Sequence, residues 1–123
     1  MSERFASHER ELCEMFANAA HGPRRNGLFA VWLILRVSGD AIAESGLSER
    51  ARRRRSEALA RRLASLNLPD ALRSSVRETA ELTTLQSLNV VPDALRDLIP
   101  TVRDTLGVRA AAVLTAAADE AAR

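Results

Sequence analysis

The side chains of this sequence whose type and spacing most clearly indicate chemistry are arginines. The chain has eighteen basic residues, all of them arginine, and seven of these lie between positions 50 and 62. They are Arg50, Arg52, Arg53, Arg54, Arg55, Arg61 and Arg62. A guanidinium binds phosphate through a planar fork of N–H donors, and arginines three or four residues apart on a helix can follow a sugar–phosphate backbone. The segment therefore predicts contact with a nucleic-acid backbone.

Two other interpretations of the arginine cluster stay open. The formal net charge is only +2, so the rest of the chain is acidic overall and the positive field is concentrated in one segment. Such a field also suits an acidic protein surface. A solvated helix face in an arginine-biased proteome would show the same residues without any partner.

A second basic group lies in the segment His21 to Gly27, which is dense in helix-breaking residues. Arg24 and Arg25 could donate two further forks to the same nucleic acid, and Gly27 would allow a backbone to approach closely. We favour the simpler interpretation, in which this segment is a loop between helices.

Little in the sequence indicates catalysis or metal binding. The chain has neither lysine nor tyrosine, and it contains no Gly-rich phosphate loop or nucleophile elbow, so we expect no enzyme activity and no cofactor. His8 and Cys13 are five residues apart and would not share a helix face, and no spacing that includes His21 resembles a zinc site. Glu9 lies within an apolar stripe, where an ion pair with Arg36 or another arginine is the simplest account.

The composition predicts an all-α fold. Apolar residues make up 46% of the 123 residues, alanine, leucine and arginine dominate, and β-branched residues are sparse. We expect one domain over residues 1–123, a compact bundle of five to six helices. Periodicity and breaker residues predict helices over Glu3–Ala20, Leu28–Glu44, Ser48–Leu66, Pro69–Leu88, Pro92–Leu98 and Thr101–Ala121. Ser48 is the expected N-cap of the third helix, and Pro100 separates the last two.

The third predicted helix has arginines where an apolar stripe should continue. The stripe of Leu59 and Leu63 reaches Arg55 and Arg52 when it is extended toward the helix start. Positive charge near the N-terminal end of a helix also opposes the helix dipole. We therefore expect something outside the chain to compensate these charges. The predicted outer face carries Arg50, Arg54 and Arg61, flanked by Arg53 and Arg62.

The second predicted helix offers an apolar surface. Its first eight residues, Leu28–Leu35, are all apolar and need to be surrounded by protein. Phe29 and Leu33 continue the solvated edge of the second half of this helix. They are either covered by another helix of the chain or form a protein-interaction patch. Phe29 and Trp32 are expected in the core, and base stacking is not expected because no aromatic residue is near the arginine segment in the sequence.

One short corner occurs twice in the sequence. Leu63–Arg73 and Leu85–Arg96 both contain Leu-x-Ser-Leu-Asn followed by Pro-Asp-Ala-Leu-Arg, with one residue inserted in the second copy. Each copy predicts a helix end with an Asn C-cap and a proline in the first turn of the next helix. We favour repeated use of one corner over a duplicated unit, because two copies are too few for a solenoid.

The sequence also indicates a compartment. The one cysteine, Cys13, cannot form an internal disulfide, which favours a reducing environment. The N-terminal segment is too acidic for a signal peptide, and the run Leu28–Leu35 is too short to span a membrane. We therefore expect a cytoplasmic protein with no membrane partner.

A family resemblance is carried by Asn26-Gly27-Leu28 and the apolar residues after it, within the ten residues Asn26–Leu35. This stretch resembles the opening of the second helix in the small all-helical subunits of CRISPR effector complexes of the Cascade type. The resemblance implies a short α-helical bundle that lines an antiviral defence complex. It also implies basic residues that hold the backbone of the target or displaced strand.

These features together predict a non-catalytic small subunit of a nucleoprotein complex. The arginines would contact the backbone of single-stranded DNA or RNA, and Phe29 and Leu33 would contact other protein subunits or a second copy of the chain. The alternative is a protein-interaction or regulatory bundle, such as a homodimer, that binds no nucleic acid. Salt dependence separates the two, because phosphate binding weakens steeply with salt and apolar association does not.

Overall fold

A computed structural model describes residues 4–44, 46–85 and 90–123 of the chain. It confirms the all-α bundle: the described residues form six α-helices and no strand. The helices are α1 (Ala6–Asn18), α2 (Pro23–Ala43), α3 (Glu49–Ala64), α4 (Asp70–Leu85), α5 (Val91–Leu106) and α6 (Val108–Ala121).

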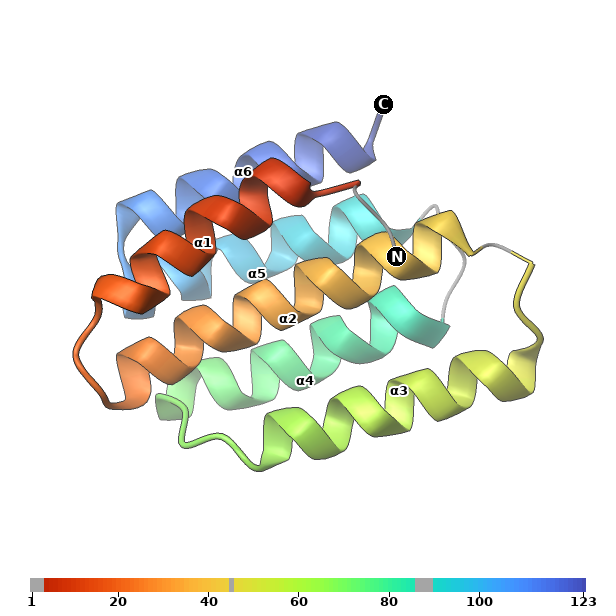
Figure 1. Ribbon diagram of the computed structural model, residues 1–123, viewed down its shortest axis with the longest axis horizontal. Coiled ribbons are helices and arrows are strands. Elements are labelled where there is room, and N and C mark those ends of the chain that lie inside the picture. The colour runs from red at the N-terminus through yellow and green to blue at the C-terminus, as the bar shows by residue number, and fades with distance from the viewer. Residues whose placement is uncertain (1–3, 45, 86–89) are drawn as a thin grey trace.

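The six helices form two layers, and α2 is the middle helix of one of them (Figure 1). In the view of Figure 1, α1, α2 and α3 lie toward the viewer, and α4, α5 and α6 lie behind them. Helix α2 contacts each of the other described helices, whereas α3 packs mainly against α4 and touches α2 only slightly. The arginine-rich helix is therefore at the edge of the bundle, with its outer face uncovered by the rest of the described chain.

The core is continuous through all six helices and is centred on α2. Leu28, Ile34 and Leu35 have no exposed surface, so the apolar run of α2 is largely covered by helices of the same chain. Gly27 of α2 lies against side chains of both α4 and α5. A Cβ atom at this position would lie 2.7 Å from Cδ2 of Leu106 and 2.9 Å from Cδ2 of Leu72. The glycine therefore permits close helix packing, and not the approach of an external backbone.

Helix α2 is also long and apolar enough to cross a membrane by length and composition alone. It has 21 residues, and the mean hydropathy of an 18-residue window within it is 1.3. Half of this window is buried inside the bundle. A helix that other helices surround needs the same composition for packing.

The predicted loop from His21 to Gly27 is wrong from Pro23 onward. Helix α2 begins at Pro23, five residues before the predicted start at Leu28, and Gly22 precedes it with a φ of 148°. Proline suits the first turn of a helix because the N–H that it lacks would have no partner there. The breaker pattern was therefore the start of a helix, and Arg24 and Arg25 lie in its first turn.

The break between the last two predicted helices is also wrong. Helix α5 continues through Pro100 to Leu106, and the chain turns at Gly107. Pro100 removes one N–H donor, but it is exposed, so water can bond the carbonyl left without a partner. Gly107 has a φ of 101° and donates its N–H to the Arg103 carbonyl at 3.1 Å. A glycine in this left-handed region ends a helix more effectively than a proline on its solvated side.

The repeated corner has the same local structure in the parts that are described. Both prolines lie at a helix start, and each is followed by an ion pair within the first turn, Asp70 with Arg73 at 3.9 Å and Asp93 with Arg96 at 3.6 Å. The predicted Asn C-cap is wrong for the first copy, since Ser65 caps α3. In the second copy, the corner and the predicted helix end at Leu88 lie outside the described residues.

Candidate nucleic-acid interface

Helix α3 has a well-defined start and a small buried face. The Ser48 side chain accepts a hydrogen bond from the Ala51 N–H at 3.2 Å, which confirms the predicted N-cap. Only Leu59 and Leu63 of this helix are buried. The helix is thus anchored by a narrow stripe, and most of its arginines are left on the surface.

Three arginines lie on the outer face of α3 as predicted. Arg50, Arg54 and Arg61 are exposed and form no ion pair or side-chain hydrogen bond with any described residue. Arg53 is also exposed, but its guanidinium lies 3.3 Å from the Glu49 carboxylate, one turn earlier. Glu57 is on the same face and forms no ion pair within the described part of the chain.

Arg52 and Arg55 face the bundle and are half-buried. Arg55 forms an ion pair with Glu44, which follows the last residue of α2. Arg52 has a buried Nε without a hydrogen-bond partner among the described residues. The expectation that an external partner compensates both charges is wrong for Arg55, because a carboxylate of the same chain does so. These two arginines are therefore poorly placed to bind a ligand.

Arg24 and Arg25 bind the C-terminal ends of two other helices. Arg24 donates to the Leu106 carbonyl at 2.9 Å, at the end of α5, and Arg25 donates through Nε to the Phe16 carbonyl at 3.3 Å, near the end of α1. Cations stabilise helix C-termini by neutralising unpaired carbonyls. Both guanidiniums therefore have partners within the chain, although the segment is the first turn of α2 and not the loop that the sequence favoured.

Aromatic rings lie beside α3, contrary to the expectation from the sequence. The rings of Phe16, Phe29 and Trp32 follow one another, with centroids 5.6 Å and 5.4 Å apart. Three guanidiniums cover them: Arg25 lies 4.4 Å from the Phe16 centroid, Arg62 5.5 Å from that of Phe29, and Arg36 5.8 Å from that of Trp32. We call these six residues the aromatic–arginine strip. It joins α1, α2 and α3.

Part of this strip could have been found from the sequence. Phe29, Trp32 and Arg36 follow the three- and four-residue spacing that places side chains together on a helix. The contact of Arg62 with Phe29 joins two helices 33 positions apart in the chain, and no local pattern indicates it.

The two predicted protein-interface residues differ in exposure. Phe29 is half-buried in the strip, whereas Leu33 has only 6% of its surface exposed. Leu33 lies at the bottom of a groove of about 270 Å³ between α2 and α3. The groove is lined by Leu33, Val37, Asp40, Arg55, Ala58, Leu59 and Arg62. The apolar patch predicted at Phe29 and Leu33 is thus mostly covered by α3.

His8 and Glu9 of α1 have structural partners. Glu9 is buried and lies 3.5 Å from the Arg36 guanidinium, as the sequence predicted. Burial raises the pKa of Glu9 above its ordinary value, and Arg36 opposes part of this effect. His8 is half-buried and lies 2.6 Å from the Glu120 carboxylate, where it ties the start of α1 to the end of α6. The described residues contain no group of three or more histidine, cysteine or acidic side chains that could hold a metal ion.

Comparison of the chain with models of known protein families, with curated proteins and with solved structures gave no match. The positions of the side chains in this structure are therefore the basis for a functional proposal.

Proposed function

We propose that this protein is a non-catalytic subunit of a nucleoprotein complex and that the outer face of α3 binds the sugar–phosphate backbone of a single-stranded nucleic acid. The observation that carries the proposal is the row of Arg50, Arg54 and Arg61. All three are exposed on an edge helix, and no carboxylate among the described residues pairs with them.

The spacing of the row suits a phosphate backbone. At 1.5 Å of rise per residue, Arg50 and Arg61 lie roughly 16 Å apart along the helix axis. A single strand laid along this row can therefore place a different phosphate near each of the three guanidiniums. Backbone contacts of this kind carry no sequence information, so binding should be similar for different sequences.

The aromatic–arginine strip favours a single strand over a duplex. Unpaired bases stack on aromatic rings and on guanidinium planes, and a duplex keeps its bases out of reach of such a surface. Arg62 belongs to both α3 and the strip, so a base of a strand that follows α3 could stack on the exposed guanidinium plane of Arg62. The resemblance of Asn26–Leu35 to small subunits of CRISPR effector complexes supports a role of this kind.

The test is the combined substitution Arg50→Gln, Arg54→Gln and Arg61→Gln. Glutamine keeps the helix propensity and removes three charges. We expect affinity for labelled single-stranded DNA and RNA to fall, and the slope of log affinity against log salt to decrease by about two, because each phosphate contact on a single strand contributes roughly 0.7. Fluorescence anisotropy over a range of salt concentrations measures both quantities.

A matched control removes the same charge elsewhere. Arg10, Arg103 and Arg123 are exposed and lie outside α3, and Arg10→Gln, Arg103→Gln and Arg123→Gln together give the same net charge as the α3 variant. This control should retain most of the salt slope. Equal binding by the parent and the α3 variant would exclude the phosphate interface.

A second candidate function is protein docking at the aromatic–arginine strip. Tryptophan, phenylalanine and arginine are enriched in the cores of protein interfaces. The strip contains three aromatic rings and three arginines. Sedimentation of the parent and of Phe29→Ser at low and high salt tests it. Association that Phe29→Ser abolishes and that salt leaves unchanged would favour docking over nucleic-acid binding.

A further inference from the structure

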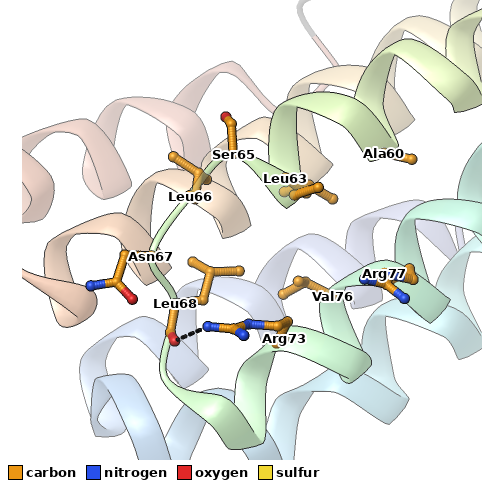
Figure 2. A pocket seen from close by; sticks show the side chains of 10 residues that line it. Ala60, Leu63, Ser65, Leu66, Asn67, Leu68, Arg73, Val76 and Arg77 are labelled. Atoms are coloured by element: carbon orange, nitrogen blue, oxygen red, sulfur yellow. Dashed lines mark hydrogen bonds between the residues drawn. The ribbon is translucent and has the colours of Figure 1, made fainter.

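A cavity at the corner between α3 and α4 is unrelated to the outer face of α3. Its volume is about 380 Å³, within the range of sites for small molecules. Figure 2 shows Ala60 and Leu63 on the α3 side, across from Arg73, Val76 and Arg77 on α4. Asn67 and Leu68 of the connecting loop lie at one end of it.

The floor of this cavity is apolar. Leu63, Leu68 and Val76 line it and are almost fully buried, with 5%, 3% and 1% of their surfaces exposed. Ala60 and Ala64 also line it, and their short side chains leave space that a longer residue would fill. A ligand in the cavity would cover the exposed apolar surface of Ala60, Ala64 and the half-buried Leu66, and so remove it from water.

The rim of the cavity is cationic. Arg73 and Arg77 are four residues apart on α4, so both point to the same side of the helix. Arg73 is held in place, because it donates to the Leu68 carbonyl at 3.3 Å (Figure 2) and lies 3.9 Å from the Asp70 carboxylate. Arg77 forms no hydrogen bond or ion pair with the described residues. Its planar fork therefore remains able to bind an anion in a bidentate manner.

We propose that this cavity binds a small amphiphilic anion, namely a carboxylate or phosphate monoester that carries a medium-length alkyl chain. The alkyl chain lies against Ala60, Ala64 and Leu66, above the buried floor, and the anionic head group accepts hydrogen bonds from Arg77. The site does not depend on nucleic-acid binding by α3, and its test needs no nucleic acid.

The probes are octanoate, octyl phosphate and octanol, each titrated below the concentration at which it forms micelles. Two-dimensional NMR follows the backbone amides of the lining residues and the Nε–H signals of Arg73 and Arg77. We expect both anions to shift these signals. Octanol should bind roughly tenfold more weakly, because charge-assisted hydrogen bonds are lost. The tighter of the two anions identifies the preferred head group.

Two variants separate the head-group site from the apolar floor. Arg77→Gln should weaken binding of both anions by roughly tenfold and leave octanol unchanged, whereas Arg103→Gln on α5 removes the same charge and should change nothing. Ala64→Leu should fill the mouth of the cavity and reduce the binding of all three probes, and Ala116→Leu on the exposed side of α6 is its control.

Three results would contradict the proposed site or its ligand class. Octanoate that shifts none of the cavity signals, or that binds Ala64→Leu as tightly as the parent, excludes the site. Octanol that binds as tightly as octanoate excludes the anionic ligand class.

Discussion

At the scale of single residues, the arginines of this chain divide by what their guanidiniums contact. Arg24 and Arg25 bond carbonyls at helix ends, and Arg55 pairs with Glu44. Arginines on the outer face of α3 have no such partners among the described residues. Substitution of the first kind should lower stability, because it leaves buried or helix-end groups without partners. Substitution of the second kind should change binding and leave the fold intact.

The buried carboxylate Glu9 makes a prediction about pH. Burial raises its pKa above the ordinary value of 4.5, so the folded protein binds this proton at a pH where the unfolded chain has released it. The stabilising contribution is therefore complete below pH 4.5 and is lost as the pH rises through the raised pKa. The side chain of the Glu9→Gln variant cannot ionise, so its contribution to stability does not change over this pH range.

We therefore expect the free energy of unfolding of the parent, relative to Glu9→Gln, to decrease as the pH rises from about 4 to 7. Urea denaturation of both proteins at several pH values measures this difference. Glu14→Gln, which changes an exposed carboxylate on the same helix, should show no comparable trend. A difference that increases with pH would mean that the ion pair with Arg36 outweighs the cost of burial.

At the scale of helices, the end of α5 is set by backbone conformation at Gly107 and not by the proline within the helix. Pro100 lies inside α5 at an exposed position, whereas Gly107 ends α5 with a φ of 101°. The two residues are both helix breakers in the sequence, but only the glycine is required by the structure. Substitution by alanine should accordingly have opposite effects at the two positions.

We expect Pro100→Ala to stabilise the protein by about 1–2 kcal/mol. It restores a helical hydrogen bond and removes a clash that together cost about 3 kcal/mol, less the entropy that proline removes from the unfolded chain. Gly107→Ala should destabilise by roughly 1 kcal/mol or more, because an alanine at this φ is strained. Thermal and urea denaturation of both variants measure the changes. Destabilisation by Pro100→Ala would mean that the entropy that proline removes from the unfolded chain outweighs its cost within α5.

At the scale of the whole molecule, stability should be unevenly distributed. Helix α3 lies at the edge and buries two side chains, whereas α5 buries Val91, Ala94, Leu95, Leu98, Val102 and Leu106. Local opening requires less free energy where fewer apolar contacts are lost. The helix that we assign to binding is therefore the one expected to open most easily.

Hydrogen exchange measures this difference directly. We expect the amides of α3 to exchange at least about tenfold faster than those of α5 in the free protein. Addition of single-stranded nucleic acid should slow exchange in α3 more than in α5, because a ligand protects the element that it binds. Equal protection of α3 and α5 in the free protein would indicate that the bundle opens only as a unit.

The sequence determined those features that depend on local preference and periodicity. The helical composition, the Ser48 cap, the outward direction of Arg50, Arg54 and Arg61, and the pairing of Glu9 with Arg36 all agree with the structure. Each of these follows from residue type or from spacing along one helix, apart from the Glu9 pair, which follows from the cost of burying an unpaired carboxylate.

The tertiary structure decided those features that depend on residues far apart in the chain. Arg55 finds Glu44, Arg62 covers Phe29, and Leu33 is covered by α3, and none of these contacts has a local signature. The continuation of α5 through Pro100 belongs to the same class, because a proline on a solvated face is tolerated once the rest of the helix is packed. Local sequence sets what each helix prefers, and only packing decides which faces meet, since that depends on the sum of contacts over the whole core.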